Sequence, residues 1–260
     1  MISAYGIGTT EFVAVGILPN IAMDMHISIP MAGLIVSMYA LGATVGAPVL
    51  TALTGRVPRK MLLLSLMMLF IAGNVIAAFS ANYAQLLTAR VLTAFAHGVF
   101  FAIGATIAAS LVPRDRRATA IAMVFSGLTI AIATGAPIGT LVGQHWGWRA
   151  TFWMVAGLGL LSLIGIAALL PGSIQVDRPG RLTDQIKVLG SGRLLLAFAM
   201  NLFGYGGTFV AFTYLAPLLE QVSGFASNRI GQILFLYGVS VVIGNAIGGH
   251  LANRSPVPLL

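Results

Sequence analysis

The chain has 260 residues, of which 58% are hydrophobic and only 8% are charged, and its mean hydropathy is +0.97. A soluble domain has about 25% charged residues, so we expect lipid, rather than water around one soluble core, to be the solvent. The absence of cysteine excludes a disulfide framework and a thiolate metal site.

Eight apolar segments follow one another along the chain, separated by polar breaks. Each is long enough to cross a hydrocarbon core of about 30 Å at about 1.5 Å per helical residue. None alternates apolar and polar residues as barrel strands do, so membrane helices are predicted. In chain order they cover 2–23, 30–53, 61–80, 83–111, 117–143, 150–170, 193–219 and 228–251.

Basic residues concentrate in every second connection between these segments. The opposite connections hold only Arg149 and Arg229, and Arg90 lies inside the fourth segment. The positive-inside rule therefore places the basic side, and the N-terminus with it, in the cytoplasm. The net charge of +8 is then a topology signal, and no nucleic-acid partner is expected. Eleven of the 14 Lys and Arg residues lie on the basic side, in the connections 55–60, 112–117 and 171–192 and at Arg193 and Arg254.

An internal repeat relates the two ends of the chain. A shift of 198 positions aligns residues 2–56 with the end of the chain without a gap and gives ten identities, where chance would give about three. The last two segments are thus predicted to copy the first two in equal orientation, unless Gly-rich apolar segments match by chance. The second copy stops after two helices, so we expect a chain that is truncated after its eighth helix. The shared residues include Pro19 with Pro217, Tyr39 with Tyr237 and Arg56 with Arg254.

Five motifs occur at separate places in this series of predicted helices. In type and order they resemble the drug and sugar efflux branch of the major facilitator superfamily, the twelve-helix proton antiporters. The resemblance covers essentially the whole chain. The motifs are Gly8–Phe12 followed by Leu18 and Pro19, Arg56–Lys60, Arg90 with His97 and Gly98, the set Gly127, Gly135, Pro137 and Gly139, and Trp146–Trp153.

The resemblance implies an all-α polytopic membrane protein of major-facilitator type. Residues 1–170 are then an N-terminal six-helix bundle, 171–192 a cytoplasmic linker, and 193–260 the first two helices of an incomplete C-terminal bundle. It also implies a proton-coupled secondary active transporter of the bacterial inner membrane that exports a drug or sugar by alternating access. Its partners are the lipid bilayer, protons and the small-molecule substrate, and the missing C-terminal helices are expected to be required.

The basic loop after the second helix departs from the family pattern. The family has an Asp before the first Arg and a Gly three residues after that Asp, where this chain has Gly55 and Pro58. The repeated loop has an Asn in place of the Asp. These loop residues are expected to set topology and, by resemblance, to form a conformational latch, of which the missing Asp removes one charge partner. The set comprises Arg56, Arg59, Lys60, Asn253 and Arg254.

Three ionisable residues inside the spans are candidates for proton coupling. Glu11 is the only acidic residue deep inside a span, where a carboxylate must face water, meet a cation or bind a proton; capping or packing is the alternative role. The resemblance assigns Arg90 to the cavity, whereas a long side chain at that depth can also snorkel to the interface. His97 lies seven residues after Arg90, on the same helical face, and is either titratable or a packing residue. Whether Glu11 and Arg90 pair is open.

The fifth helix carries a second candidate site. Gly127, Gly135, Pro137 and Gly139 should kink the helix and allow close packing, either as a hinge for alternating access or as an ordinary small-residue contact.

Tyr39, Asn201 and Tyr205 are candidates for lining a substrate cavity. Single polar residues in membrane helices also bond simply to neighbouring helices, so that alternative stands beside the first.

Three functions remain in competition. The leading one is export of a drug or sugar in exchange for protons. The others are proton-driven import on the same scaffold and a transport-inactive fragment. The sequence shows no nucleophile–base pair, no paired carboxylates and no phosphate-binding loop, so neither an enzyme nor an ATP-driven pump is predicted. With four His and no Cys, no metal and no other cofactor are expected.

Overall fold

The computed structural model describes residues 1–55, 57–172 and 191–252, and every regular element in this part of the chain is helical. Seven helical stretches among these residues are long and apolar enough to cross a membrane. The predicted linker 171–192 falls largely outside the described residues, as do Arg56, Asn253 and Arg254.

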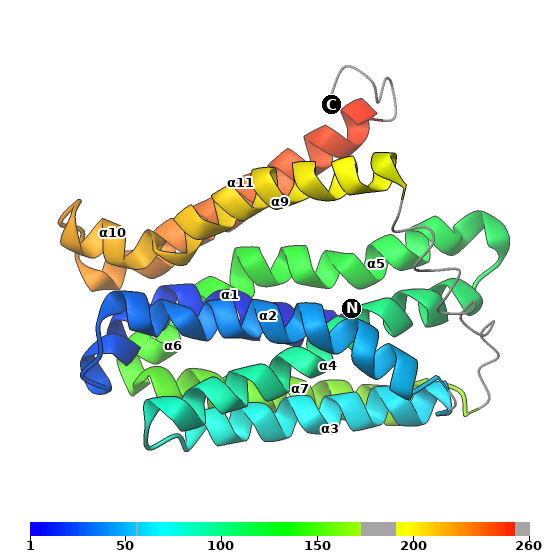
Figure 1. Cartoon of the computed structure of the whole chain (residues 1–260), viewed down its shortest axis with the longest axis horizontal. Helices are drawn as coiled ribbons and strands as arrows, with labels where there is room; N and C mark the ends of the chain where they lie inside the picture. The colour runs from blue at the N-terminus through cyan, green and yellow to red at the C-terminus, as the bar shows by residue number, and fades with distance from the viewer. Residues whose placement is uncertain (56, 173–190, 253–260) are drawn as a thin grey trace.

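The helices follow the predicted spans closely (Figure 1). Two of the helices begin at a polar N-cap: the Ser28 and Asn82 side chains accept hydrogen bonds from the first turns of the helices that follow them. The first six spans correspond to α1 (Ile2–Asp24), α2 (Ile29–Leu53), α3 (Arg59–Ala78), α4 (Tyr83–Ser110), α5 (Arg117–Ile130) continued by the π-helical turn η2 (Ala131–Gly135) and α6 (Ala136–Trp146), and α7 (Trp148–Leu169). The last two correspond to α9 (Gly192–Thr213) continued by α10 (Leu215–Gln221), and to α11 (Ile230–Ala252). The short 3₁₀ turns η1 (Arg114–Arg116) and η3 (Ser227–Arg229) precede α5 and α11.

Two spans that the sequence predicts as single helices are interrupted, and a proline lies beside each break. The π-helical turn η2 comes directly before α6, which has Pro137 in its first turn. The other break is at Tyr214, between α9 and α10, where Pro217 follows three residues later. Proline has no N–H to donate to the carbonyl four residues earlier, so one bond of the ladder is missing at each position. Pro19 and Pro48 lie inside helices that continue through them, so proline weakens the helix at these places but does not by itself end it.

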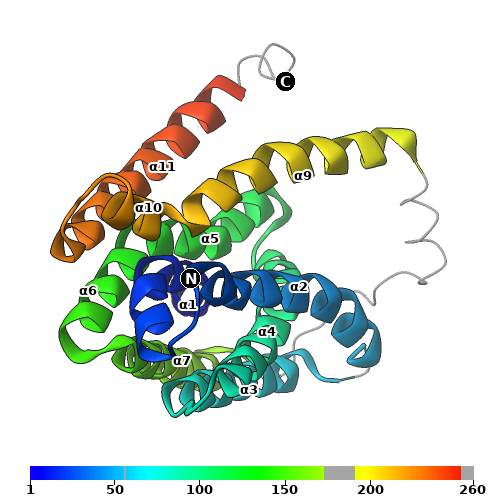
Figure 2. The ribbon, with the colours of Figure 1, turned by 60° about the vertical axis from the view of Figure 1, so that its left-hand side comes forward.

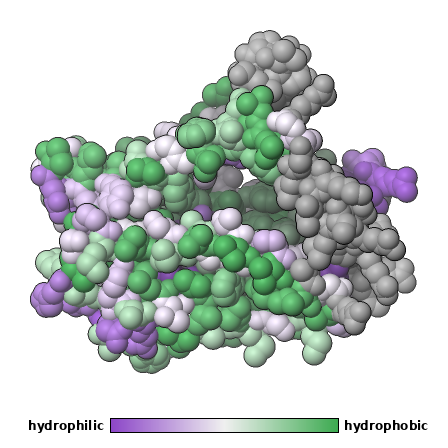
Figure 3. Space-filling model, viewed as in Figure 1, coloured by the Kyte–Doolittle hydropathy of each residue, from purple (hydrophilic) through white to green (hydrophobic). Residues whose placement is uncertain are grey.

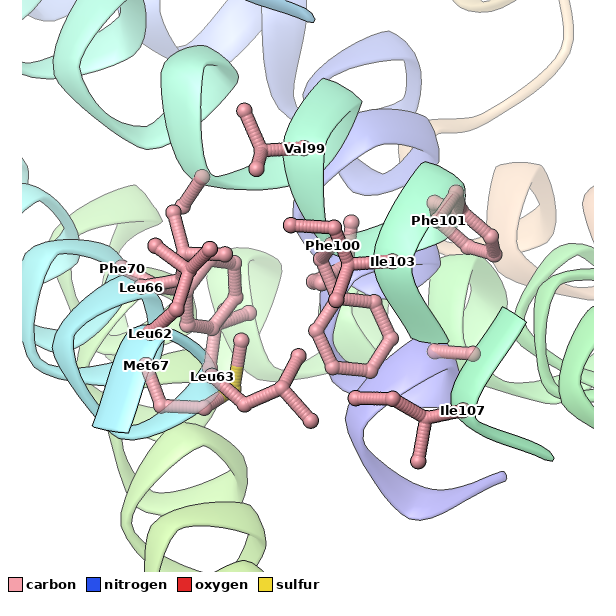
Figure 4. Packing of buried hydrophobic residues seen from close by; sticks show 14 residues of the cluster. Leu62, Leu63, Leu66, Met67, Phe70, Val99, Phe100, Phe101, Ile103 and Ile107 are labelled. Carbon is pink, nitrogen blue, oxygen red and sulfur yellow. The ribbon is translucent and has the colours of Figure 1, made fainter. Parts of the chain in front are cut away.

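Helices α1–α7 form one bundle, and α9 to α11 form a second layer beside it (Figure 2). Within the bundle α1 contacts α2, α5, α6 and α7, while α4 packs on α2 and α3. One apolar cluster fills the space between α3 and α4, where Leu66, Met67 and Phe70 meet Val99 and Phe100 (Figure 4). Ala4 and Ile7 of α1 and Val155 of α7 complete this cluster, so the core joins the first and last helices of the bundle to the two in its middle.

The two ends of the bundle differ in charge. The turns that follow α2, α4 and α7 lie together at one end, and those that follow α1, α3 and α6 lie at the other (Figure 1). We call the first the basic end, because it carries five described basic residues at the ends of its helices, whereas the other end has Arg149 and Arg229. Between the ends the visible surface is mainly apolar (Figure 3), as expected of a face in contact with lipid. The five residues are Arg59, Lys60, Arg114, Arg116 and Arg117.

The second layer touches the bundle chiefly at the end opposite the basic one. There α10 packs on α1, and α11 packs on η2 and α6. Phe212, Ala216, Ile230 and Leu234 are buried in this contact. Toward the basic end α9 and α11 diverge from the bundle, and the surface is hollowed between the two layers (Figures 2 and 3).

Close packing of α2 on α4 depends on Gly98. A Cβ atom at Gly98 would lie 2.6 Å from the Ala43 carbonyl oxygen, which is backbone and cannot move aside easily. We expect Gly98→Ala to destabilise the protein by about 1–3 kcal/mol through overpacking and to lower its Tm in detergent.

Gly104→Ala on the same helix is the matched control, because its nearest neighbour would lie at an ordinary contact distance of 3.6 Å. Equal Tm values for the two variants would contradict the assigned α2–α4 packing.

Candidate functional site

The guanidinium of Arg90 is buried in the middle of the bundle. Its side chain extends from α4 and is 1% exposed. Nη1 donates to the Thr10 carbonyl of α1 at 2.8 Å, and Nε donates to the Ile35 carbonyl of α2 at 3.4 Å. The guanidinium carbon also lies 4.1 Å from the centre of the Tyr39 ring, a cation–π contact. Nη2 is buried without a hydrogen-bond partner among the described residues. The predicted alternative, snorkelling to the interface, is therefore wrong for this conformation.

Two neutral side chains connect this arginine to α3. The Thr10 hydroxyl donates to Asn74 Oδ1 at 2.8 Å, and Asn74 Nδ2 donates to the Phe70 carbonyl at 2.8 Å. Arg90 Nη1 lies 3.3 Å from the same hydroxyl oxygen. Thr10 and Asn74 are both fully buried. We refer to Thr10, Ile35, Tyr39, Asn74 and Arg90 as the Arg90 cluster.

Glu11 and His97 lie beside this cluster. His97 Nδ1 shares a 3.0 Å hydrogen bond with the Tyr39 hydroxyl. Glu11 Oε2 is 3.7 Å from the same nitrogen, which is longer than a direct hydrogen bond. The two side chains keep 20% and 17% of their surface exposed, so neither is as deeply buried as Arg90. A titratable pair therefore borders the buried cation.

Glu11 and Arg90 do not form an ion pair within 4.0 Å in the described part of the chain. They are connected indirectly, because Arg90 binds the carbonyl of Thr10, the residue before Glu11, and stacks on Tyr39, the partner of His97. Helical spacing explains part of this arrangement. Arg90 and His97 are seven residues apart and face the same way, toward α1 and α2.

The predicted cavity residues separate into two groups. Tyr39 is 2% exposed and belongs to the Arg90 cluster. Asn201 and Tyr205 lie on α9, in the second layer, and both are exposed. Tyr205 stacks on Phe209 with ring centres 5.8 Å apart, and Phe209 in turn meets Phe12, the residue after Glu11. The structure therefore connects Tyr205 to the neighbourhood of Glu11 through aromatic rings.

An aromatic cluster joins the two layers next to Glu11. Phe12 contacts Phe209 and Phe212, with ring centres 6.2 and 6.1 Å apart, and Phe212 stacks on Tyr237 at 4.7 Å. Phe209 is the residue that the internal repeat pairs with Glu11. The repeat thus places an ionisable group in one layer opposite an aromatic ring in the other.

The fifth span is interrupted beside α1 and α11, and its glycines are tightly packed. A Cβ atom at Gly135 would collide with the Thr9 side chain of α1, and one at Gly139 would collide with Val13. On the other side, a Cβ atom at Gly238 of α11 would collide with the backbone of Ala133 in η2. Gly127 is equally close to the start of α1. The π-helical turn therefore lies where both layers meet; a hinge role for these residues stays a prediction.

Lys60 of the basic loop caps a helix. Its Nζ donates to the carbonyls of Ala167 and Leu170 at the end of α7, at 2.8 and 2.6 Å. A cation at a helix C-terminus is favourable because the unpaired carbonyls there carry partial negative charge. Arg59 is partly buried at the start of α3. The latch role of the basic loop stays a prediction, since its other members lie outside the described residues.

Sequence reasoning missed the importance of Thr10, Asn74 and Phe12. Asn74 was one of several single polar residues in the spans, and nothing in its own helix shows that it faces Thr10. The one available signal was indirect: Thr10 is shared by both copies of the repeat, with Thr208 as its mate.

Apolar helices of membrane-spanning length, a buried cation between them and charge gathered at one end define a polytopic α-helical membrane protein. The chain belongs to the Major Facilitator Superfamily, whose family model matches residues 1–260. The all-α fold predicted from the motifs is confirmed.

Relatives of this chain are found among bacterial transporters. The Uncharacterized MFS-type transporter YtbD of Bacillus subtilis is 50% identical over 259 residues, which cover 100% of this chain and 65% of that protein. The Inner membrane transport protein YdhP of Escherichia coli is 40% identical over 98% of this chain and 65% of its own length. The Chloramphenicol resistance protein of Streptomyces lividans is 35% identical over 100% of this chain and 67% of its own length. The chain thus spans about 65% of the length of the first two.

Two solved structures show the same fold. A bacterial homolog of the human lysosomal transporter Spinster, in an inward-facing and unoccupied conformation, matches with a TM-score of 0.72 at 18% identity, over 98% of this chain and 62% of that one. A D-xylose–proton symporter matches with a TM-score of 0.73 at 15% identity, over 97% of this chain and 67% of that one. At these identities the likeness extends to the fold alone.

The double contact of Tyr39 can be tested by two substitutions. Tyr39→Phe keeps the ring over Arg90 and removes only the hydroxyl that meets His97, so we expect a loss of about 1 kcal/mol. Tyr39→Leu also removes the ring, and we expect a further loss of about 2 kcal/mol because the cation–π contact is desolvated. Thermal unfolding in detergent measures both. Equal losses would show that the ring does not stabilise Arg90.

Proposed function

We propose that this protein works as a proton-coupled secondary active transporter that exports a small organic molecule, a drug or a sugar, by alternating access. The observation that carries the proposal is the partly exposed Glu11–His97 pair beside a buried, incompletely bonded arginine inside a membrane bundle. Ionisable groups in membrane spans are costly and generally functional. A partly exposed carboxylate that has no Arg or Lys within 4.0 Å in the described part of the chain is suited to bind and release a proton.

The chemistry requires one exchangeable proton. With the transporter open to the outside, Glu11 takes up a proton. After the switch to the inward-open state, the substrate binds near Tyr39 and Tyr205, and the proton leaves Glu11 for the cytoplasm. The negative carboxylate then lies beside His97 and Arg90. The positive charge of Arg90 favours the deprotonated carboxylate until the substrate has been carried outward. The next proton from outside displaces the substrate and resets the cycle.

The arrangement of the two layers supports alternating access. They meet at the end opposite the basic loops and diverge toward the basic end. The positive-inside rule assigns the basic end, and with it the N-terminus, to the cytoplasm. Under that assignment the cavity is open to the inside. The division of the chain into a bundle of residues 1–170, a linker 171–192 and a second unit from 193 follows as part of the same proposal.

Export rather than import is supported by two likenesses. The glycine and proline residues of the fifth span resemble the antiporter motif, and one relative is named Chloramphenicol resistance protein. We therefore take chloramphenicol as the first probe and L-arabinose as the second. The D-xylose–proton symporter shares the fold alone and does not favour import.

Glu11→Gln should abolish transport that is driven by a pH gradient, because the amide cannot carry a proton. The measurement is flux of radiolabelled chloramphenicol, then L-arabinose, in proteoliposomes with an imposed gradient. Glu220→Gln is the matched control, since Glu220 lies on α10, away from the cluster. Undiminished gradient-driven flux in Glu11→Gln would overturn the assignment of Glu11.

The same measurement separates the competing functions. Flux against the direction of proton entry indicates export, and flux along it indicates import. If the 260-residue chain shows no flux while a chain extended to the length of its relatives transports, the fragment alternative holds.

A cross-link between the layers tests alternating access. A Cβ atom at Gly231 of α11 would lie 3.1 Å from Cγ of Leu141 in α6, which suits a disulfide, and the chain has no other cysteine. We expect oxidised Leu141→Cys/Gly231→Cys to lose transport and to recover it on reduction, because this contact must open to the outside. The single variants are the controls. Full transport by the cross-linked protein would contradict the proposed cycle.

A further inference from the structure

The hydrogen bonds around Arg90 form a chain with a fixed direction. The Phe70 carbonyl can only accept, so Asn74 must point its amide group toward it and its carbonyl oxygen toward α1. The Asn74 oxygen then accepts the Thr10 hydroxyl proton. The Thr10 oxygen is left with its lone pairs toward Arg90 Nη1, 3.3 Å away. All three side chains are buried, so water does not compete for these bonds.

We propose that Thr10 and Asn74 are positioning residues for the transport cycle. They hold the Arg90 guanidinium at a fixed place beside Glu11 and leave its Nη2 atom free to bind an oxygen atom during the cycle. The proposal rests on the proposed function above, because it gives the hydrogen-bond chain a role in proton coupling. It also explains why two neutral residues are buried side by side in different membrane helices.

The unpaired Nη2 follows from how the rest of the guanidinium is held. Nη1 and Nε are committed to carbonyls of α1 and α2, and the Tyr39 ring covers one face. A buried donor without an acceptor is unfavourable by about 1–3 kcal/mol. The site therefore attracts any oxygen that reaches it, from the substrate or from the Glu11 carboxylate. The Thr10 hydroxyl adds a 3.3 Å contact to Nη1 beside the bond to the Thr10 backbone carbonyl at 2.8 Å. Without the hydroxyl, only the carbonyl holds Nη1, and the guanidinium gains freedom to turn about that bond.

The charge balance at Glu11 depends on few groups. The titratable or charged side chains around it are His97 and Arg90 of α4 and Tyr39 of α2, while Tyr205 of α9 stacks on Phe209 in the second layer beside Phe12. In the described part of the chain, α3 contributes the neutral Asn74 to this region through Thr10. A displaced Arg90 therefore changes the field at Glu11 without a compensating charge nearby.

The decisive comparison is Thr10→Val against Thr10→Ser. Valine keeps the shape of threonine and removes the hydroxyl, whereas serine keeps the hydroxyl. The readout is the infrared carbonyl band of protonated Glu11, assigned by its disappearance in Glu11→Gln and followed as a function of pH in the purified full chain. We expect the midpoint in Thr10→Val to move by about half a pH unit or more, and the midpoint in Thr10→Ser to stay at the wild-type value.

A second variant distinguishes the positioning role from a general loss of protein stability. Asn74→Leu breaks the same chain from α3, and we expect it to shift the midpoint as Thr10→Val does, with little further shift in the double variant. Thr140→Val is the matched control, because this buried hydroxyl donates only to the Ala136 carbonyl of its own helix. A role in folding alone would lower the Tm of these variants and leave the midpoint unchanged, which would overturn the proposal.

Failure of this inference and failure of the proposed function give different results. If Glu11→Gln still transports with the pH gradient, the proposed function fails whatever the infrared band does. If Glu11 is required for transport but its band titrates identically in Thr10→Val and the wild type, only the positioning role fails.

Discussion

The structure depends on one constraint: the guanidinium of Arg90 is buried within a bundle that lies in lipid, so protein groups must replace its water. Two helices supply them directly, and a third supports one of these contacts. The Thr10 carbonyl comes from α1, the Ile35 carbonyl and the Tyr39 ring come from α2, and Asn74 of α3 holds Thr10 in place. A charge in a hydrocarbon region is stable only in such a setting, so the rotation and depth of α1–α4 are set by the need to solvate a single residue of α4.

The polar cluster is confined to one layer, although the sequence repeats. Thr10, Gly6 and Pro19 have equivalents in the second copy, but Glu11 corresponds to Phe209, and this ring packs on Phe12. Equivalent helices therefore differ in their ionisable groups, and also in shape, because α1 continues through Pro19 while its counterpart is interrupted at Tyr214 beside Pro217. One layer holds the charges and the other presents aromatic surface to them, which is the asymmetry expected if a single proton site serves the whole transporter.

The sequence predicts the helices well because lipid imposes a length on every span, and apolar runs of that length are easily recognised. The interruptions beside Pro137 and Pro217 were only half predictable: a kink was expected in the fifth span, whereas the break at Tyr214 was not. The hardest feature to predict was which side chains of different helices contact one another. Tyr39 and Asn201 are both polar residues in apolar spans, yet one stacks on Arg90 and the other is exposed on α9. The difference depends on helix rotation and on which helices are neighbours, and neither is encoded in local pattern.

The contact between the layers is of a different physical kind from the contacts within the bundle. It consists of aromatic rings and glycine-to-backbone packing, as where Gly238 meets η2, and one side-chain hydrogen bond, from Gln144 to the Ser227 carbonyl at the loop end, joins the layers in the described part of the chain. Apolar contacts can slide or separate without leaving buried donors unpaired, whereas breaking the Arg90 cluster would leave several. The layers can therefore move against each other while the arginine keeps its place. Under the proposed function, access would change by opening the apolar contact between the layers, while the Arg90 cluster stays intact inside the bundle.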